Sequence, residues 1–129
     1  MILLDTSALI GSFCGSCPSG PVLDGILERG EPIGIPSLVL YEWFRGPRTA
    51  DELAIQKRLL PAERALSYGP EDAALSARIY QAIRRARDRE IDIAIAATAI
   101  RHEATLWTLN EADFRDIPGL RLYRAKPNI

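Results

Sequence analysis

Several acidic or amide side chains in this sequence could together bind a metal ion. Each lies inside an apolar segment or directly beside one: Asp5, Glu42, Asp92, and the pair Asn110 and Asp113. Their oxygen atoms are ligands that hard divalent cations such as Mg²⁺ and Mn²⁺ accept. Carboxylates that share one pocket without a cation repel one another, which raises their pKa values. The sequence therefore predicts an oxygen-ligated metal site if the fold brings these residues together.

Glu42 is the most unusual of these acids. Its neighbours from Leu38 to Phe44 are all apolar or aromatic, and an acid in such a segment is costly to bury unless a positive charge compensates it. A divalent cation would supply that charge, although Glu42 could instead pair with Arg45 on the next helical turn.

The other candidates also have ordinary structural explanations. Asp5 and Asp92 could cap helices, Asp113 could be a surface acid beside Arg115, and Asn110 could be a turn residue. Mg²⁺ or Mn²⁺ among carboxylates suits phosphodiester hydrolysis, in which the cation lowers the pKa of a bound water. Zinc is disfavoured because the chain has a single histidine. The predicted chemistry thus requires no nucleophilic side chain.

Short apolar strands alternate with helices along the chain. Strands are expected at 2–4, 33–35, 105–108 and 120–123, with a weaker candidate at 64–68. Helices are expected after Asp5, with Thr6 or Ser7 as cap, and at 22–29, 36–45, 49–60, 70–89, 93–100 and 111–114. This alternation predicts an α/β fold in which a parallel sheet is covered on both faces and ligands bind at the carboxyl ends of the strands.

Composition narrows the class of protein. The 129 residues are 47% hydrophobic and 26% charged, with a net charge of −1, which fits one folded domain over residues 1–129. No apolar run is long enough to span a bilayer and no secretory signal is recognisable, so we expect a cytoplasmic protein with no membrane partner. The near-zero charge argues against coating nucleic acid by bulk attraction, but the arginines at 78–89 could be either a solvated helix face or a rim that contacts RNA phosphates.

The two cysteines form a C-x-x-C pair, Cys14 and Cys17, which is also found in redox motifs. A thioredoxin-like motif opens a helix, whereas this pair lies toward the end of the first predicted helix. We therefore expect no thiol chemistry there.

The chain closely resembles PIN-domain ribonucleases, in particular the VapC toxins of toxin–antitoxin pairs. The resemblance runs along essentially the whole chain through LLDTSALI, SLVLYEWFRG, IDIAIAATAIRHEATLWTLNEADF and IPGLRLY. It implies a PIN-like three-layer sandwich with a central parallel sheet flanked by helices, and Mg²⁺- or Mn²⁺-dependent RNA cleavage. It also implies a VapB-like antitoxin as partner, and a homodimer.

The family's acidic positions can be carried over one at a time. The acid after the first strand matches Asp5, the acid of the E-x-x-x-G helix matches Glu42, and the acid of D-x-x-I-A-A matches Asp92. The fourth position matches either Asn110 or Asp113. The same resemblance implies that the hydroxyl groups of Thr6, Ser7 and Thr108 support the acidic cluster.

The chain departs from the family pattern before the third acid. Many members have an Arg-Gly pair there, whereas this chain runs Arg87-Asp88-Arg89-Glu90-Ile91 into Asp92 without a glycine. Asp88 and Glu90 are therefore alternatives to Asp92, although the Ile-Ala-Ala match favours Asp92. Many members also have aspartate where this chain has Asn110, so the fourth carboxylate could come from Asp113.

Three other functions fit the sequence less well than a ribonuclease toxin does. A catalytically silent PIN-like module that only binds RNA or protein would have no need to keep three acids. A receiver-like signalling domain would have adjacent acids after its first strand and a lysine across the pocket. A haloacid-dehalogenase-type phosphatase would have a second acid where this chain has Ser7.

Overall fold

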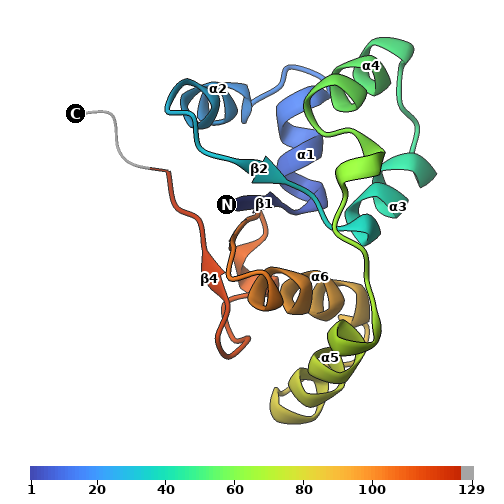
Figure 1. Cartoon of the computed structure of the whole chain (residues 1–129), viewed down its shortest axis with the longest axis vertical. Coiled ribbons are helices and arrows are strands. Elements are labelled where there is room, and N and C mark those ends of the chain that lie inside the picture. Colours follow the sequence, from blue (N-terminus) through green and yellow to red (C-terminus); the bar gives the residue numbers. More distant parts are fainter. Residues whose placement is uncertain (126–129) are drawn as a thin grey trace.

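A four-stranded parallel sheet with strand order β2-β1-β3-β4 forms the centre of the computed structural model, which describes residues 1–125 (Figure 1). Its strands are β1 (Ile2–Leu4), β2 (Ile33–Gly34), β3 (Thr105–Trp107) and β4 (Arg121–Leu122). All three pairings are parallel, and Leu4 at the end of β1 lies opposite Trp107 at the end of β3. The chain segments that leave β1 and β3 therefore start side by side at one edge of the sheet.

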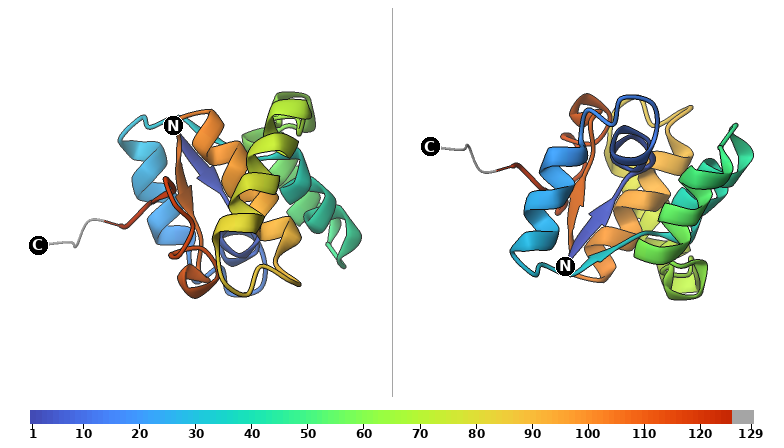
Figure 2. Two further views of the ribbon diagram at one scale, coloured as in Figure 1. Left: turned by 90° about the horizontal axis from the view of Figure 1, so that it is seen from below. Right: turned by 90° about the horizontal axis from the view of Figure 1, so that it is seen from above.

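Helices cover both faces of this sheet, so the predicted three-layer architecture is confirmed. They are α1 (Thr6–Phe13), α2 (Gly20–Glu28), α3 (Ser37–Arg45), α4 (Ala50–Leu59), α5 (Pro70–Ala82) and α6 (Glu90–Arg101), with single 3₁₀ turns at Ala62–Arg64 and Glu111–Asp113. Helix α2 lies on one side of the sheet, while α5 and α6 lie on the other (Figure 2). Within residues 1–125, no helix has both the length and the hydropathy required to cross a bilayer.

Helix α6 contributes more buried residues than any other helix. Seven consecutive residues, 93–99, are buried, four of them alanine, and α6 packs extensively against α5. Small side chains allow neighbouring elements to approach closely on every side of the helix. The alanine-rich run thus fixes the position of Asp92 in its first turn.

Two sequence predictions about the connections are wrong. The strand predicted at 64–68 is only an isolated bridge between Pro36 and Leu66, because Pro36 has no N–H to donate and α3 begins at Ser37. The helix predicted to reach Arg89 ends at Ala82. In the connection to α6, Arg85 and Asp88 adopt left-handed conformations, with φ of 56° and 68°, which a continuous α-helix cannot contain.

The predicted cap of the first helix is also wrong. Asp5 is the N-cap residue of α1, and its side chain makes no capping hydrogen bond. The hydroxyls of Thr6 and Ser7 bond to acidic side chains instead of to the helix backbone. Helix α4, in contrast, begins with a complete capping box between Thr49 and Glu52.

Candidate active site

Asp5 lies at the end of β1, where two hydroxyl groups hold its carboxylate. Thr108 Oγ1 donates to Asp5 Oδ2 at 2.8 Å, and Ser7 Oγ donates to the same oxygen at 3.0 Å. The backbone N–H of Asp5 donates to the carbonyl of Trp107 at 2.9 Å. Although the residue is only 4% exposed, its charge is thus met by one donor from α1 and one from the residue that follows β3.

These hydroxyls also join the two strand ends to each other. Ser7 Oγ accepts from the N–H of Leu109 at 2.9 Å, and Thr108 Oγ1 accepts from the N–H of Asn110 at 3.0 Å. Ser7 and Thr108 lie 3.2 Å apart, oxygen to oxygen. The polar network therefore ties the β1–α1 turn to the segment that follows β3.

Glu42 faces the same edge of the sheet from α3. Thr6 Oγ1 donates to its Oε1 at 2.6 Å, and Arg45 Nη2 donates to its Oε2 at 3.3 Å. The Glu42 side chain is 16% exposed, and α3 packs against α1 at this point of the fold. Both the pairing with Arg45 and the position near the other acids are therefore present.

Asp92, in the first turn of α6, is electrostatically coupled to the other three acids. Burial, followed by the negative charges of Asp5, Asp113 and Glu42, raises the pKa of the Asp92 carboxyl to about 6, although the Arg89 charge acts in the opposite direction. No donor among residues 1–125 forms a hydrogen bond with the Asp92 carboxylate. The structure thus brings all four predicted acids to one site.

The fourth position of the site is an exposed turn after β3. Asp113 ends the 3₁₀ turn Glu111–Asp113, and Asn110 immediately precedes that turn. Both residues are exposed. Asp113 is near enough for its charge to act on Asp92, whereas the only hydrogen bonds of Asn110 within residues 1–125 involve its backbone.

Arg89 clamps this turn to the start of α6. Its guanidinium donates to the backbone carbonyl of Asp113 at 2.7 Å and to both carboxylate oxygens of Asp116, at 2.5 and 2.9 Å. The ion pair raises the pKa of Arg89 and lowers that of Asp116. This clamp could not be predicted from the sequence, because nothing in the local pattern relates residues that are 27 positions apart.

A cleft of about 390 Å³ opens beside these acids. Its lining residues are Glu42, Arg45, Asp88, Glu90, Ile91 and Asp92. All three acids considered for the third position thus line this cleft, and burial together with the charges of other acids raises the pKa of Asp92. The cleft is large enough for a phosphate group and its neighbouring atoms, and Arg45 gives it one cation.

The donor set fits a hard divalent cation, since it consists of carboxylate and hydroxyl oxygens. Within residues 1–125, however, no three His, Cys, Asp or Glu side chains are arranged to hold a metal ion as they stand. Glu42 is turned toward Thr6 and Arg45, and the carboxylates repel one another. A bound cation would therefore have to draw the acids closer together.

The cysteine pair lies away from this chemistry. Both thiols are free, and burial together with a contact to Glu52 raises the pKa of Cys14 to about 11. A thiol with such a pKa is almost entirely protonated at neutral pH, which agrees with the expectation of no thiol reactivity.

Comparison with known proteins identifies the class to which this fold and site belong. The PIN domain model matches residues 2–120, and the chain therefore belongs to the PIN domain family. The family resemblance seen in the sequence is thus confirmed. No curated protein sequence matches the chain.

The chain also resembles several solved structures. The chain resembles a DNA-bound VapBC from Salmonella typhimurium, with a TM-score of 0.74, 23% identity and coverage of 95% of this chain and 96% of that one. It resembles FitAcB from Neisseria gonorrhoeae with a TM-score of 0.73, 22% identity and coverage of 95% and 97%. A toxin–antitoxin complex from Klebsiella pneumoniae gives a TM-score of 0.71, 25% identity and coverage of 93% and 95%.

Proposed function

We propose that this single-domain protein is a Mg²⁺- or Mn²⁺-dependent endoribonuclease and the toxin of a toxin–antitoxin pair. The observation that carries the proposal is the meeting of four acids from separate elements at one edge of a parallel sheet. Burial, together with the charges of the other three acids, raises the pKa of Asp92 to about 6. Perturbed carboxyl groups beside a cleft are typical of functional sites.

The acids would divide into cation ligands and supporting groups. Asp5, which is 4% exposed, and Asp92, whose pKa is raised, would bind the cation, with Glu42 and Asp113 completing the site directly or through water. When bound, the cation supplies a water of lowered pKa and positive charge beside the phosphate.

The remaining residues would position these ligands and the RNA. Thr108 and Ser7 fix one oxygen of Asp5 and leave the other free to bind. Thr6 orients Glu42. Arg45, which lines the cleft, would turn from Glu42 toward a phosphate oxygen, since a guanidinium pairs equally well with either anion.

Asp113 is favoured over Asn110 as the fourth metal-site residue. Its charge acts on Asp92, and Arg89 holds its backbone. An asparagine oxygen can coordinate a cation but adds no negative charge, so it would contribute less to binding. Asn110 remains the alternative that the family's sequence pattern suggests.

The structural relatives support the proposed partners. The similar structures are VapBC, FitAcB and toxin–antitoxin complexes, each of which pairs two kinds of protein. We expect a VapB-like antitoxin to bind this chain, RNA to be its substrate, a homodimer to be its assembly, and the cytoplasm to be its location.

Cleavage of a labelled RNA by purified protein tests the proposed function. The wild type should cleave in Mg²⁺ or Mn²⁺ and stop in EDTA, and Asp5→Asn should be inactive because it removes a ligand charge at constant volume. Asp24→Asn, a matched change at an exposed position of α2, should cleave normally. Metal-dependent cleavage that survives in Asp5→Asn would refute the assigned site, and a wild type that cuts no RNA would point to a binding module.

A further inference from the structure

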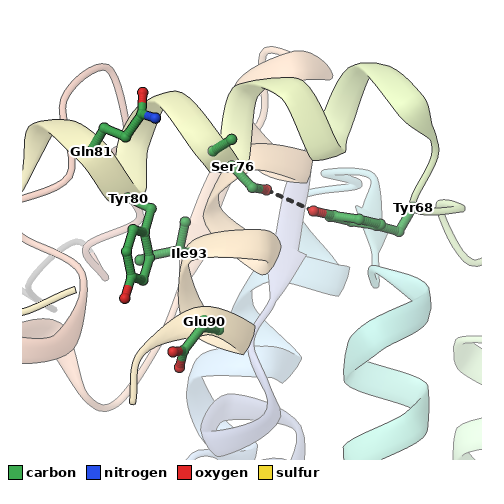
Figure 3. Close-up of a pocket in the computed structure, with 7 residues that line it drawn as sticks. Tyr68, Ser76, Tyr80, Gln81, Glu90 and Ile93 are labelled. Atoms are coloured by element: carbon green, nitrogen blue, oxygen red, sulfur yellow. Dashed lines mark hydrogen bonds between the residues drawn. The ribbon is translucent and has the colours of Figure 1, made fainter. Parts of the chain in front are cut away.

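A second hollow lies directly beside the acidic cleft. It has a volume of about 330 Å³, within the range of small-ligand sites, and it is lined mainly by apolar atoms of α5, α6 and the segment before α5. Its lining residues are Tyr68, Ser76, Ala77, Tyr80, Gln81, Glu90 and Ile93 (Figure 3). We call this hollow the tyrosine groove.

Two aromatic rings form its walls. Tyr68 and Tyr80 stand on opposite sides of Ser76 and Ile93 (Figure 3), and they are 37% and 42% exposed. The Tyr68 hydroxyl donates to Ser76 Oγ at 3.0 Å, which orients that ring. The Tyr80 hydroxyl forms no hydrogen bond within residues 1–125, so both the ring and the hydroxyl are accessible to a ligand.

The tyrosine groove adjoins the candidate active site. Glu90 lines both the groove and the acidic cleft, and Ile93 follows Asp92 directly in α6. A ligand that extends from the cleft along the first turn of α6 would therefore enter the groove.

The loop that joins α5 to α6 adds positive charge next to both hollows. Arg84, Arg85 and Arg87 are exposed, and no ion pair within residues 1–125 involves their side chains. This loop runs from the end of α5, beside Gln81, to Glu90 at the start of α6. A polyanion on this path would meet unpaired guanidinium groups, which bind phosphates strongly.

We propose that the tyrosine groove binds a base of single-stranded RNA, a nucleotide or two from the phosphate in the acidic cleft. This inference rests on the proposed function and extends it to a substrate subsite. Aromatic rings beside a positively charged path are the combination that binds single strands, because every base has a flat apolar face that stacks. Glu90 at the groove's edge can also accept a hydrogen bond from an exocyclic amino group of the base.

Binding of RNA hexanucleotides tests the groove without relying on cleavage. Dissociation constants are measured by fluorescence anisotropy with Ca²⁺ in place of Mg²⁺, for an unmodified hexamer and for six hexamers with one abasic site each. Tyr80→Ala should weaken binding of the unmodified hexamer about tenfold, the loss of one stacked base. Tyr80→Phe keeps the ring and should bind within twofold of wild type.

The abasic series identifies what the ring contacts. In the wild type, one abasic position should weaken binding about tenfold, and in Tyr80→Ala the same abasic site should cause no further loss, because both changes remove one contact. Phe44→Ala removes another exposed ring, from α3, which is 53% exposed against 42% for Tyr80, and is the matched control, with no expected change.

Three results would overturn the tyrosine groove as a base subsite. The first is unchanged RNA binding by folded Tyr80→Ala. The second is that the losses of affinity caused by Tyr80→Ala and by the abasic site add. The third is an equal loss of affinity at all abasic positions together with a change of oligomeric state in sedimentation, which would make the groove a contact between copies of the chain. Failure of the wild type to cleave RNA in Mg²⁺ would refute the proposed function instead, and it is measured separately.

Discussion

The two sides of the acidic cleft hold their carboxylates in different ways. On the side of α1 and α3, Asp5 accepts two hydroxyl hydrogen bonds, and Glu42 accepts one from Thr6 and one from Arg45. On the side of α6, the carboxylate of Asp92 has no donor among residues 1–125, and its pKa is raised to about 6. Charge is thus compensated on one side and left uncompensated on the other.

This difference indicates where a cation would have its largest effect. Hydroxyl donors already stabilise Asp5 and Glu42, so a cation adds less there, whereas at Asp92 it removes the repulsion from three other acids. A site that is unfavourable while empty binds its cation more tightly, at the expense of the stability of the metal-free protein. We therefore expect the Asp92 carboxylate to lower the stability of the metal-free protein while being required for its activity.

The largest effect is expected for Asp92→Asn. The variant should lose cleavage by at least a hundredfold, yet its metal-free form should be about 1–2 kcal/mol more stable than wild type at pH 7.5, after allowance for partial exposure. The sign follows from the raised pKa: native Asp92 binds its proton more tightly than the unfolded chain does. The metal-free wild type should therefore lose stability as pH rises from about 4 to 6, and Asp92→Asn should not.

Urea unfolding in EDTA across this pH range measures the effect. Asp88→Asn is the control, since it removes a charge from the same cleft at a residue whose left-handed backbone asparagine also tolerates. Equal stabilisation by Asp88→Asn would show that net charge in the cleft, rather than Asp92 itself, is responsible.

The next largest effect concerns the fourth position. Asp113→Ala should lower cleavage and Mn²⁺ affinity about tenfold, because it removes a charge that acts on Asp92. Asn110→Asp should keep or increase Mn²⁺ affinity, because it adds charge at the same turn. Cleavage assays and metal titrations of both variants decide the matter: a silent Asp113→Ala beside an inactive Asn110→Ala would reverse the assignment.

Removal of the clamp should have a smaller effect on activity. Arg89→Ala should destabilise the protein by about 2–3 kcal/mol, since it breaks charged hydrogen bonds of a largely buried guanidinium, whose side chain is 17% exposed. It should also raise the pKa of Asp92 further, because the Arg89 charge lowers it. The pH profile of cleavage would then move upward, an effect that a purely structural role of Arg89 would not produce. Asp116→Asn should leave that profile in place.

The smallest effect is expected at Asp88, which occupies the place of the glycine that the family's Arg-Gly pair leads one to expect. Its φ of 68° is costly for a residue with a Cβ, so Asp88→Gly should stabilise the protein by about 0.5–1 kcal/mol relative to Asp88→Asn. Gly119→Ala, at φ +82° with open space around it, should destabilise by a similar amount. Thermal melts measure the stability of these variants. A lower melting temperature for Asp88→Gly than for Asp88→Asn would show that the side chain at position 88 makes a stabilising contact.

The sequence was sufficient for the positions of the acids because each marks the end or the interior of an apolar element. Asp5 follows a three-residue buried strand, and Asp92 precedes the buried, alanine-rich run of α6, so the parallel order of the strands places them together. Glu42 was recognisable because an acid is unfavourable within an apolar helix.

Contacts between distant segments could not be predicted in this way. The Arg89–Asp116 ion pair and the hydrogen bond from Thr6 to Glu42 depend on how whole helices pack against one another. The end of α5 was also missed, because residues 83–89 have good helix propensity and only the need to reverse direction before α6 stops the helix. Tertiary structure outweighed local preference in each case.

The most direct test of the central claim is Mn²⁺ binding measured by calorimetry at two pH values. If the acids form one cation site, the wild type should bind Mn²⁺ at pH 7.5 and bind it about tenfold more weakly at pH 5, because a proton on Asp92, with its pKa of about 6, must then be displaced. The Asp5→Asn variant should show no binding at either pH. Equal affinity at both pH values, or undiminished binding by Asp5→Asn, would contradict the claim that these carboxylates form the metal centre.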